Sequence, residues 1–206
     1  MTILIFCEFD NGTIKKSSLE LISKANDLRC SPDEEIILET LNPHDDAWAL
    51  CEIIAKIKPR IILASNSTTA KDIFPRIAAR MKIGLATDVV DLKMADNRLV
   101  AKKPLYSGKV FCEVHFSTEI QMALVRPNSF SINISTISIP TSTRRHVDTS
   151  AQSHSSRASA RLLETHQDTT SQHGDITEAE IIVAGGRGMT SAENFNILNE
   201  LAETLG

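Results

Sequence analysis

Short apolar runs alternate with amphipathic segments over the first 81 residues of the chain. Apolar runs predict strands, at Thr2–Phe9, Glu35–Thr40 and Arg60–Ala64. Apolar residues at helical spacing predict the helices that separate and follow these strands, at Ser17–Arg29, Asp45–Lys58 and Thr68–Met81. Strands that alternate with helices of this length form βαβ units, so we expect a three-layer α/β fold. Its mostly parallel sheet should carry helices on both faces.

The helix boundaries carry recognisable signals. Ser17 followed by Glu20 matches a capping box, which makes Ser17 the expected N-cap of the first helix. Pro59 is expected to stop the second helix. Pro75 is expected to kink the third helix or divide it into two turns.

The pattern changes after Ile83, where strand-like stretches follow one another without helices between them. They are Ala86–Met94, Leu99–Lys103, Val110–Phe116, Ile120–Val125 and Ile132–Ile139. Asn, Gly and Pro residues separate them, as expected of antiparallel strands that complete a mixed sheet.

A polar stretch interrupts the chain at Thr141–Ser159, where nine of the nineteen residues are Ser or Thr. A stretch with so few apolar residues cannot cover a core, so it is predicted to be a loop or disordered linker. Arg161–His166 is expected to add a last strand. Residues 1–140 then form one domain, and residues 141–174 form the linker.

Residues 175–206 repeat the strand–turn–helix pattern and are predicted to begin a second α/β domain. Glu180–Ala184 is an apolar strand candidate, and glycines follow it at positions 185, 186 and 188. Thr190–Glu193 matches a capping box at the start of an expected helix, Ser191–Leu205.

Composition narrows the class of partner. The 206 residues contain 22 Lys and Arg against 26 Asp and Glu, a net charge of −4. A nucleic-acid binder normally carries a clustered basic excess, so nucleic acid is excluded as the leading partner. No stretch approaches the roughly 20 apolar residues of a membrane-spanning helix, and no secretory signal or transit peptide is recognisable at the start of the chain. We expect a cytoplasmic protein without membrane insertion.

The cysteines and histidines carry no ligand spacing. Cys7, Cys51 and Cys112 lie in apolar runs and are expected to be reduced core residues, and no C-x-x-C pair joins them or Cys30. Four of the six histidines lie in or near the polar stretch, at His146, His154, His166 and His173. They favour a solvated loop over a metal site, and we predict no metal and no catalytic residue.

The turn at Gly185, Gly186, Arg187 and Gly188 is the strongest candidate binding site. A glycine turn that leads into a helix presents free N–H groups to a phosphate, and Arg187 can add a bidentate contact. The spacing matches neither a dinucleotide fingerprint nor a P-loop, so a tight turn without a ligand remains the alternative.

Two weaker candidates lie in the first domain. Ser65–Thr69 follows a strand at the edge where open α/β sheets bind ligands, although hydroxyls that cap the next helix explain it more simply. Asp88, Asp91 and Asp96 could bind a cation, but solvated turn carboxylates are the favoured interpretation.

At several of these motifs the chain resembles the α subunit of electron transfer flavoprotein. The segments that carry the resemblance are Glu8–Gly12, Leu63–Thr69, Thr87–Val89, Lys103–Gly108, Val125–Phe130 and Glu178–Met189. The last of these is the most specific, because it is similar to the entry of the family's FAD domain. The family pattern continues for roughly another 100 residues, a domain's length, and its principal FAD ligands lie in that continuation past Gly206.

The resemblance implies an electron carrier subunit, not an enzyme, in a heterodimer with a β subunit. In the family, FAD takes electrons from acyl-CoA and related dehydrogenases, as in fatty acid β-oxidation, and passes them to a membrane quinone oxidoreductase of the respiratory chain. The resemblance places Gly185, Gly186, Arg187 and Gly188 near the cofactor, but this chain alone is not expected to retain FAD. It does not transfer Asn66 and Thr68 as nucleotide ligands, because that site belongs to the β subunit. The alternative is a non-redox interaction module, or an inactive truncated subunit.

Overall fold

The computed structural model describes residues 2–10, 12–31, 33–41, 47–133, 176, 179 and 181–205. Contacts divide the chain into two compact units, Met1–Thr165 (unit 1) and His166–Gly206 (unit 2). The predicted domain limits, residues 1–140, 141–174 and 175–206, stay a prediction, because the segment between the described parts of the two units lies outside the described residues.

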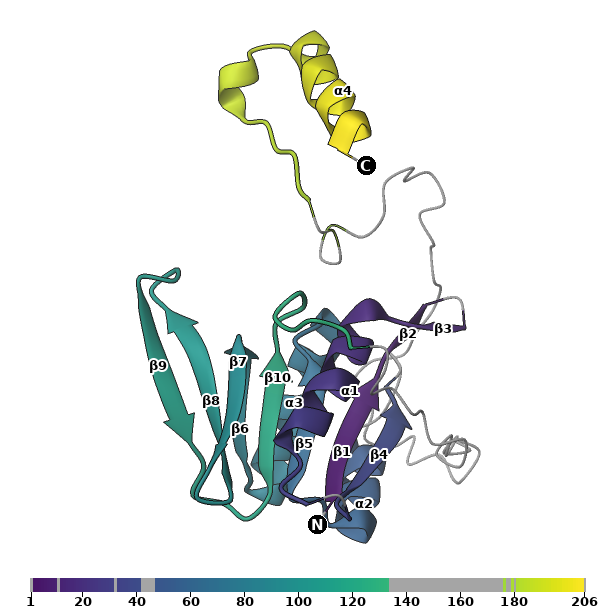
Figure 1. The fold of residues 1–206 in the computed structure, drawn as a ribbon, viewed down its shortest axis with the longest axis vertical. Coiled ribbons are helices and arrows are strands. Elements are labelled where there is room, and N and C mark those ends of the chain that lie inside the picture. The colour runs from purple at the N-terminus through teal and green to yellow at the C-terminus, as the bar shows by residue number, and fades with distance from the viewer. Residues whose placement is uncertain are drawn as a thin grey trace. The chain divides into compact units, whose positions relative to one another are not determined.

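A parallel sheet forms the centre of unit 1 (Figure 1). Its order is β4-β1-β5-β10-β6, and every neighbouring pair is parallel. The strands are β1 (Thr2–Cys7), β4 (Glu35–Thr40), β5 (Ile61–Ser65), β6 (Gly84–Val89) and β10 (Gln121–Val125). This confirms the predicted α/β class with a mostly parallel sheet.

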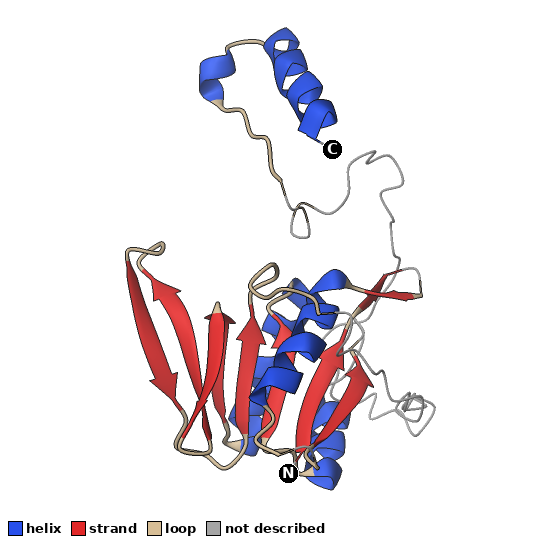
Figure 2. Cartoon of the chain, in the orientation of Figure 1, coloured by secondary structure: helices blue, strands red, loops and turns tan. Residues whose placement is uncertain are grey.

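Helices cover both faces of this sheet, as Figure 2 shows. They are α1 (Lys16–Leu28), α2 (Ala47–Ile57) and α3 (Thr68–Met81). Successive side chains of a strand point to opposite faces, so Ile3 and Ile5 pack with α1 while Leu4 and Phe6 pack with α2 and α3. Phe6 meets Phe74 of α3 edge to face, with ring centroids 5.3 Å apart. Burial on both faces explains why the central strands are continuous apolar runs.

The antiparallel strands form a separate sheet of three strands, β7 (Asp91–Ala95), β8 (Arg98–Leu105) and β9 (Val110–His115). The predicted single strand Ala86–Met94 is wrong in its continuity. Asp88 adopts φ 60° and the chain changes partner at Val90, so β6 joins the parallel sheet while β7 pairs with β8. A short β2–β3 ribbon (Phe9–Asp10, Thr13–Ile14) follows β1.

The expectation that Ile120–Val125 is antiparallel is also wrong, because β10 lies between β5 and β6 and is parallel to both. Each residue of β10 is buried, whereas β9 is largely exposed. The apolar run of β10 therefore reflects a central position in the main sheet.

The capping prediction at Ser17 is wrong. The N-cap of α1 is Lys15, without a side-chain cap, and Ser17 lies buried inside the helix. Glu20 accepts hydrogen bonds from the N–H groups of Asn128 (3.2 Å) and Phe130 (3.4 Å), and burial raises the pKa of its carboxyl. A tertiary role for Glu20 has replaced the local capping contact.

Pro75 does not divide α3, which runs unbroken from Thr68 to Met81. Pro75 lies on the exposed face of the helix. The carbonyl of Lys71, which loses its helical partner, can therefore be hydrated by water, so the helix tolerates the missing N–H.

In the described part of unit 2, helical structure begins only at Arg187. Ile181–Ala184, part of the predicted strand, pairs with no described strand, since a strand needs a hydrogen-bonded neighbour. Two 3₁₀ turns follow, η2 (Arg187–Met189) and η3 (Ala192–Phe195), and then α4 (Asn196–Leu205). Ser191 makes no side-chain cap, so the second capping box is wrong as well. No helix among the described residues has the length and apolar character needed to cross a bilayer.

The polar stretch Thr141–Ser159 and the predicted strand Arg161–His166 lie outside the described residues, as does Ile132–Ile139 beyond position 133. Residues 132 and 133 belong to no strand.

Candidate functional site

The carboxyl ends of the parallel strands bring together the polar residues that follow them. Glu8 follows β1, Asn66 and Ser67 follow β5, Asp88 lies near the end of β6, and Arg126 follows β10. The connection after β1 leads to β4 on one side, and the connection after β5 leads toward β6 on the other. The sheet therefore has its topological switch point between β1 and β5, where open α/β sheets bind ligands.

A side chain of the protein occupies this switch point. The hydroxyl of Ser67 donates to the Glu8 carboxylate and accepts from the backbone N–H of Ala70 at 3.1 Å, which caps α3. Lys15 Nζ lies 3.8 Å from the other Glu8 oxygen, and Glu8 is buried. An anionic ligand that approached the positive end of α3 would meet the Glu8 carboxylate, so this edge disfavours a phosphate.

The neighbouring part of the edge is an ion pair. Arg126 donates from Nε and an Nη atom to the two oxygens of Asp88, at 2.9 and 2.7 Å. The hydrogen bond from Arg126 holds the pKa of Asp88 below its ordinary value, and that bond raises the pKa of Arg126. Asn66 Nδ2 lies 3.3 Å from the same carboxylate. The bidentate geometry fixes the end of β10 against the end of β6.

The structure separates the remaining acidic candidates. Asp91 accepts from its neighbour Leu92 N–H at 2.8 Å and lies 3.8 Å from Lys24 Nζ, while Asp96 belongs to the tight turn between β7 and β8. No group of three or more potential metal ligands occurs among the residues that the structure describes. Asp88 is thus an ion-pair partner and not the solvated carboxylate that the sequence suggested.

The glycines of the turn in unit 2 differ in the space around them: Gly185 has close neighbours, whereas Gly186 and Gly188 have none within 4 Å. A Cβ on Gly185 would lie 2.4 Å from Leu198 Cδ1 and 3.0 Å from Phe195 Cε1, so any side chain at this position would displace the Leu198 side chain of α4 or the Phe195 ring of η3. Added Cβ atoms on Gly186 and Gly188 would meet nothing within 4 Å, and neither residue has a positive φ. Nothing in the described residues explains why these two positions are glycine.

The same turn carries the positively charged side chain of Arg187. Arg187 is exposed and forms no ion pair with a described residue. The first N–H groups of η2, at Arg187 and Gly188, have no partner inside the turn, as at any helical start. Open backbone beside an unpaired guanidinium is suited to an anionic group.

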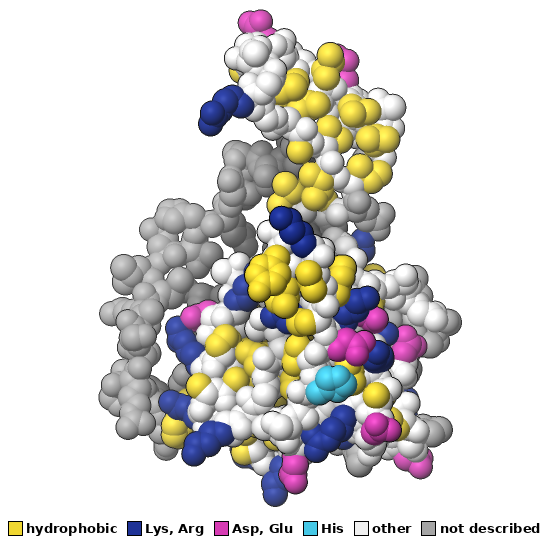
Figure 3. Space-filling view, turned by 90° about the vertical axis from the view of Figure 1, so that its left-hand side faces the viewer, with side chains coloured by type: hydrophobic (Ala, Val, Ile, Leu, Met, Phe, Trp, Pro, Cys, Tyr) yellow, Lys and Arg dark blue, Asp and Glu magenta, His cyan; other side chains and the backbone are white. Residues whose placement is uncertain are grey.

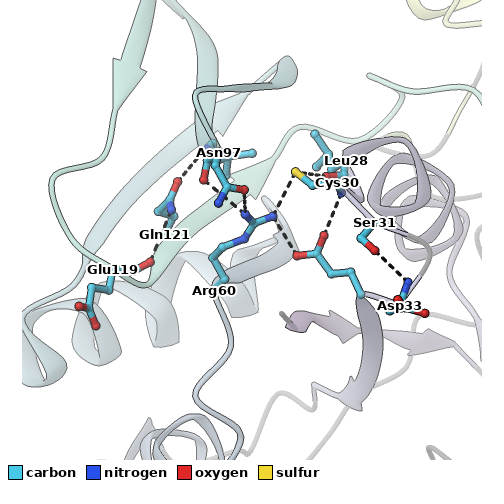
Figure 4. A network of polar contacts seen from close by, with 10 residues as sticks. Leu28, Cys30, Ser31, Asp33, Arg60, Asn97, Glu119 and Gln121 are labelled. Atoms are coloured by element: carbon cyan, nitrogen blue, oxygen red, sulfur yellow. Dashed lines mark hydrogen bonds and ion pairs between the residues drawn. The ribbon is translucent and has the colours of Figure 1, made fainter.

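A buried network at the opposite edge of the sheet was not found from the sequence. Arg60, at the start of β5, lies 2.8 Å from Glu34, and the two side chains are 10% and 2% exposed. The guanidinium also donates to the side chain and the carbonyl of Asn97, and Glu34 accepts from Cys30 N–H at 2.9 Å (Figure 4). The network joins three segments far apart in the sequence, and no local pattern indicates it.

The four cysteines are free thiols. Cys7 is buried as predicted, and desolvation, with a smaller effect of Glu39, raises its pKa to about 12. Cys51 and Cys112 are only partly buried, because both lie where a helix or edge strand faces water on one side.

Family models match both units. The electron transfer flavoprotein domain matches residues 34–154, more than half of the chain, and the electron transfer flavoprotein FAD-binding domain matches residues 175–206.

Relatives described as electron transfer flavoprotein subunit alpha come from bacteria and plants. The electron transfer flavoprotein subunit alpha of Bacillus subtilis is 33% identical over 173 residues, which cover 84% of this chain and 51% of the relative. That of Clostridium acetobutylicum is 30% identical, with 93% and 57% covered, and the mitochondrial protein of Oryza sativa subsp. indica is 35% identical, with 100% and 66% covered. The chain therefore spans between half and two thirds of the length of these relatives.

The fold and the glycine turn define an α/β protein with a candidate anion-binding turn in its second unit. The matches make the class specific: the chain belongs to the electron transfer flavoprotein family and is similar to its α subunits.

Proposed function

We propose that this chain acts as an electron transfer flavoprotein α subunit, an electron carrier and not a catalyst of substrate turnover. The match of both family models, in the order and over the units described above, is the observation that supports the proposal. In this role it pairs with a β subunit, takes electrons from acyl-CoA-type dehydrogenases and delivers them to a quinone oxidoreductase of the respiratory chain. Cytoplasmic localisation remains a prediction.

Gly186, Arg187 and Gly188 are the residues of this chain that we assign to FAD. The open space at both glycines and the unpaired Arg187 guanidinium fit an anionic part of the cofactor, its pyrophosphate. The bound flavin ring would supply the redox chemistry. The chain contributes close backbone approach at the glycines and positive charge at Arg187. Gly185, in contrast, serves the packing of α4 and η3.

Unit 1 is proposed to be a docking domain that does not bind a nucleotide. The Glu8–Ser67 contact places a carboxylate at the position where a nucleotide phosphate would approach α3. This supports leaving Asn66 and Thr68 out of the ligand set.

A second candidate function is a non-redox interaction module that binds a partner without FAD. The observation that favours it is the buried Glu8 carboxylate at the switch point of unit 1, which disfavours a nucleotide phosphate there.

The visible spectrum separates the two functions. The chain is mixed with FAD, alone and with a β subunit from the organism that encodes it, and free flavin is removed. Retained flavin absorbance that falls in Arg187→Ala but not in Arg76→Ala supports the carrier; Arg76 is an exposed arginine in a surface pair with Asp72. A colourless complex with the β subunit favours the interaction module. A colourless chain that forms no complex contradicts both functions.

A further inference from the structure

The hairpin between β8 and β9 ends in exposed apolar side chains. We name four residues the hairpin tip: Leu105 (37% exposed), Tyr106 (78%), Val110 (51%) and Phe111 (54%). Leu105 pairs with Val110 across the two strands on one face of the hairpin, and Phe111, the next residue of β9, pairs with Pro104 on the opposite face, so a hollow that receives the end of the hairpin would contact both faces. Figure 3 faces this side of unit 1 and shows hydrophobic side chains gathered over it, with Lys and Arg around them. Exposed apolar side chains that gather at the end of a hairpin indicate an interaction surface.

The turn holds the hairpin tip in a conformation that the core does not require. Tyr106, Ser107 and Gly108 have φ of 51°, 58° and 85°, so three successive residues occupy the left-handed region. Hydrogen bonds from Gly108 N–H to the Leu105 carbonyl (3.1 Å) and from Lys109 N–H to the Tyr106 carbonyl (3.3 Å) close the turn. Left-handed backbone is unfavourable for a tyrosine, and this ring is the most exposed of the four hairpin-tip side chains. Backbone strain at an exposed aromatic residue indicates a role in recognition.

The border of the hairpin tip is basic although the chain as a whole carries a net charge of −4. Lys102 and Lys109 are exposed, and the Lys102 ammonium lies 4.9 Å from the centre of the Phe111 ring. The carboxylate on the same face, Glu113, is already paired with Lys93 at 2.6 Å. The lysines of this border therefore favour a partner surface that carries carboxylates.

We propose that the hairpin tip is the surface by which unit 1 docks its partner subunit, and that the partner presents an apolar hollow bordered by Asp or Glu. The inference rests on the heterodimer of the proposed function and names the side chains that carry it. Tyr106 and Phe111 are the anchors, because aromatic residues bury large area at little cost in conformational entropy. Lys102 and Lys109 set orientation and association rate.

The test measures the affinity of the full chain for the β subunit of the same organism by sedimentation velocity and by surface plasmon resonance. The variants are Tyr106→Ser, Phe111→Ser and Lys109→Glu. Trp48→Ser is the matched control, since Trp48 is a 38% exposed aromatic residue on α2. Urea unfolding of each variant shows whether the fold is retained.

We expect Tyr106→Ser and Phe111→Ser to weaken the complex at least tenfold with an unchanged unfolding midpoint, and Trp48→Ser to bind like the wild type. Lys109→Glu should slow association and reduce its dependence on salt. Wild-type affinity in both hairpin variants overturns the docking surface and leaves the heterodimer intact. If the wild-type chain forms no complex with the β subunit, the heterodimer and the docking surface are both overturned.

Discussion

The buried pair of Arg60 and Glu34 gives a prediction whose size follows from its burial. Arg60→Ala removes the cation but leaves the Glu34 carboxylate 2% exposed, with Cys30 N–H as its remaining hydrogen-bond donor among the described residues. It also removes the two hydrogen bonds to Asn97 that hold the β7–β8 turn against the start of β5.

The expected loss is large because an unpaired carboxylate remains buried. Breaking a buried ion pair by removing one partner costs about 3–5 kcal/mol. Most domains have a free energy of unfolding of roughly 5–15 kcal/mol, so this single change should remove a large share of it. An exposed pair behaves differently: Asp72 and Arg76, one helical turn apart and about 60% exposed, are expected to contribute about 0.3–0.5 kcal/mol.

Urea unfolding followed by circular dichroism measures both variants. Arg60→Ala should lower the free energy of unfolding by at least 3 kcal/mol on the same estimate, and Arg76→Ala by less than about 1 kcal/mol. The double variant Arg60→Met with Glu34→Leu should recover most of the loss, because it leaves no charge buried. A loss below about 1 kcal/mol in Arg60→Ala would refute the reasoning, since it would mean that water reaches the Glu34 carboxylate.

Three further measurements test other parts of unit 1. Arg126 lowers the folded-state pKa of Asp88, so the ion pair stabilises the fold above the ordinary pKa of 3.8 and this stabilisation is lost as the pH falls through the lowered pKa. Asp88→Asn should therefore flatten the acid side of a curve of unfolding free energy against pH. The change should be less than about 1 kcal/mol, because both side chains are partly exposed. A steeper acid limb in the variant would contradict this sign. Iodoacetamide at pH 8 should modify the exposed Cys30 thiol and leave Cys7 unmodified until the protein unfolds, because Cys7 is buried and its pKa is raised to about 12. Equal labelling of Cys7 and Cys30 in the folded protein, measured by peptide mass spectrometry, would contradict this prediction. Pro75→Ala should raise the free energy of unfolding by about 1–2 kcal/mol, since a helix-interior proline costs roughly 3 kcal/mol and the looser unfolded chain offsets part of the gain. A lower urea midpoint in this variant would show that the proline ring packs usefully.

Local pattern was sufficient for most elements. The strand Glu35–Thr40 and the helix Thr68–Met81 have the predicted limits, because apolar runs and helical spacing are properties of neighbouring residues. The same reasoning failed at Ser17, whose capping signal is genuine in form but whose partner Glu20 is occupied by residues more than 100 positions away. A local contact loses when a tertiary contact satisfies the same group.

Strand direction was beyond the local pattern. An apolar run has the same appearance in a parallel and an antiparallel strand, so Gln121–Val125 could not be assigned to the centre of the main sheet from its spacing. Its one distinguishing feature is apolar character on both faces, which Val110–His115 lacks.

The candidate sites likewise differ in how far they could be recognised from the sequence. The glycine turn was recognisable because its residues are adjacent in the sequence, whereas the approach of Leu198 and Phe195 to Gly185 is visible only in the structure. The contact of Glu8 with Ser67 joins residues 59 positions apart, and the pair of Asp88 with Arg126 joins residues 38 positions apart.

The sequence by itself determined the α/β class, most element limits, the family and the position of the glycine turn, because each of these is written in short segments. Only the tertiary structure decided which carboxylate occupies the switch point, which arginine is buried and which hairpin residues remain exposed. The physical reason is that charge pairing and burial depend on the order of strands in the sheet. That order places distant residues side by side and is not encoded in local periodicity.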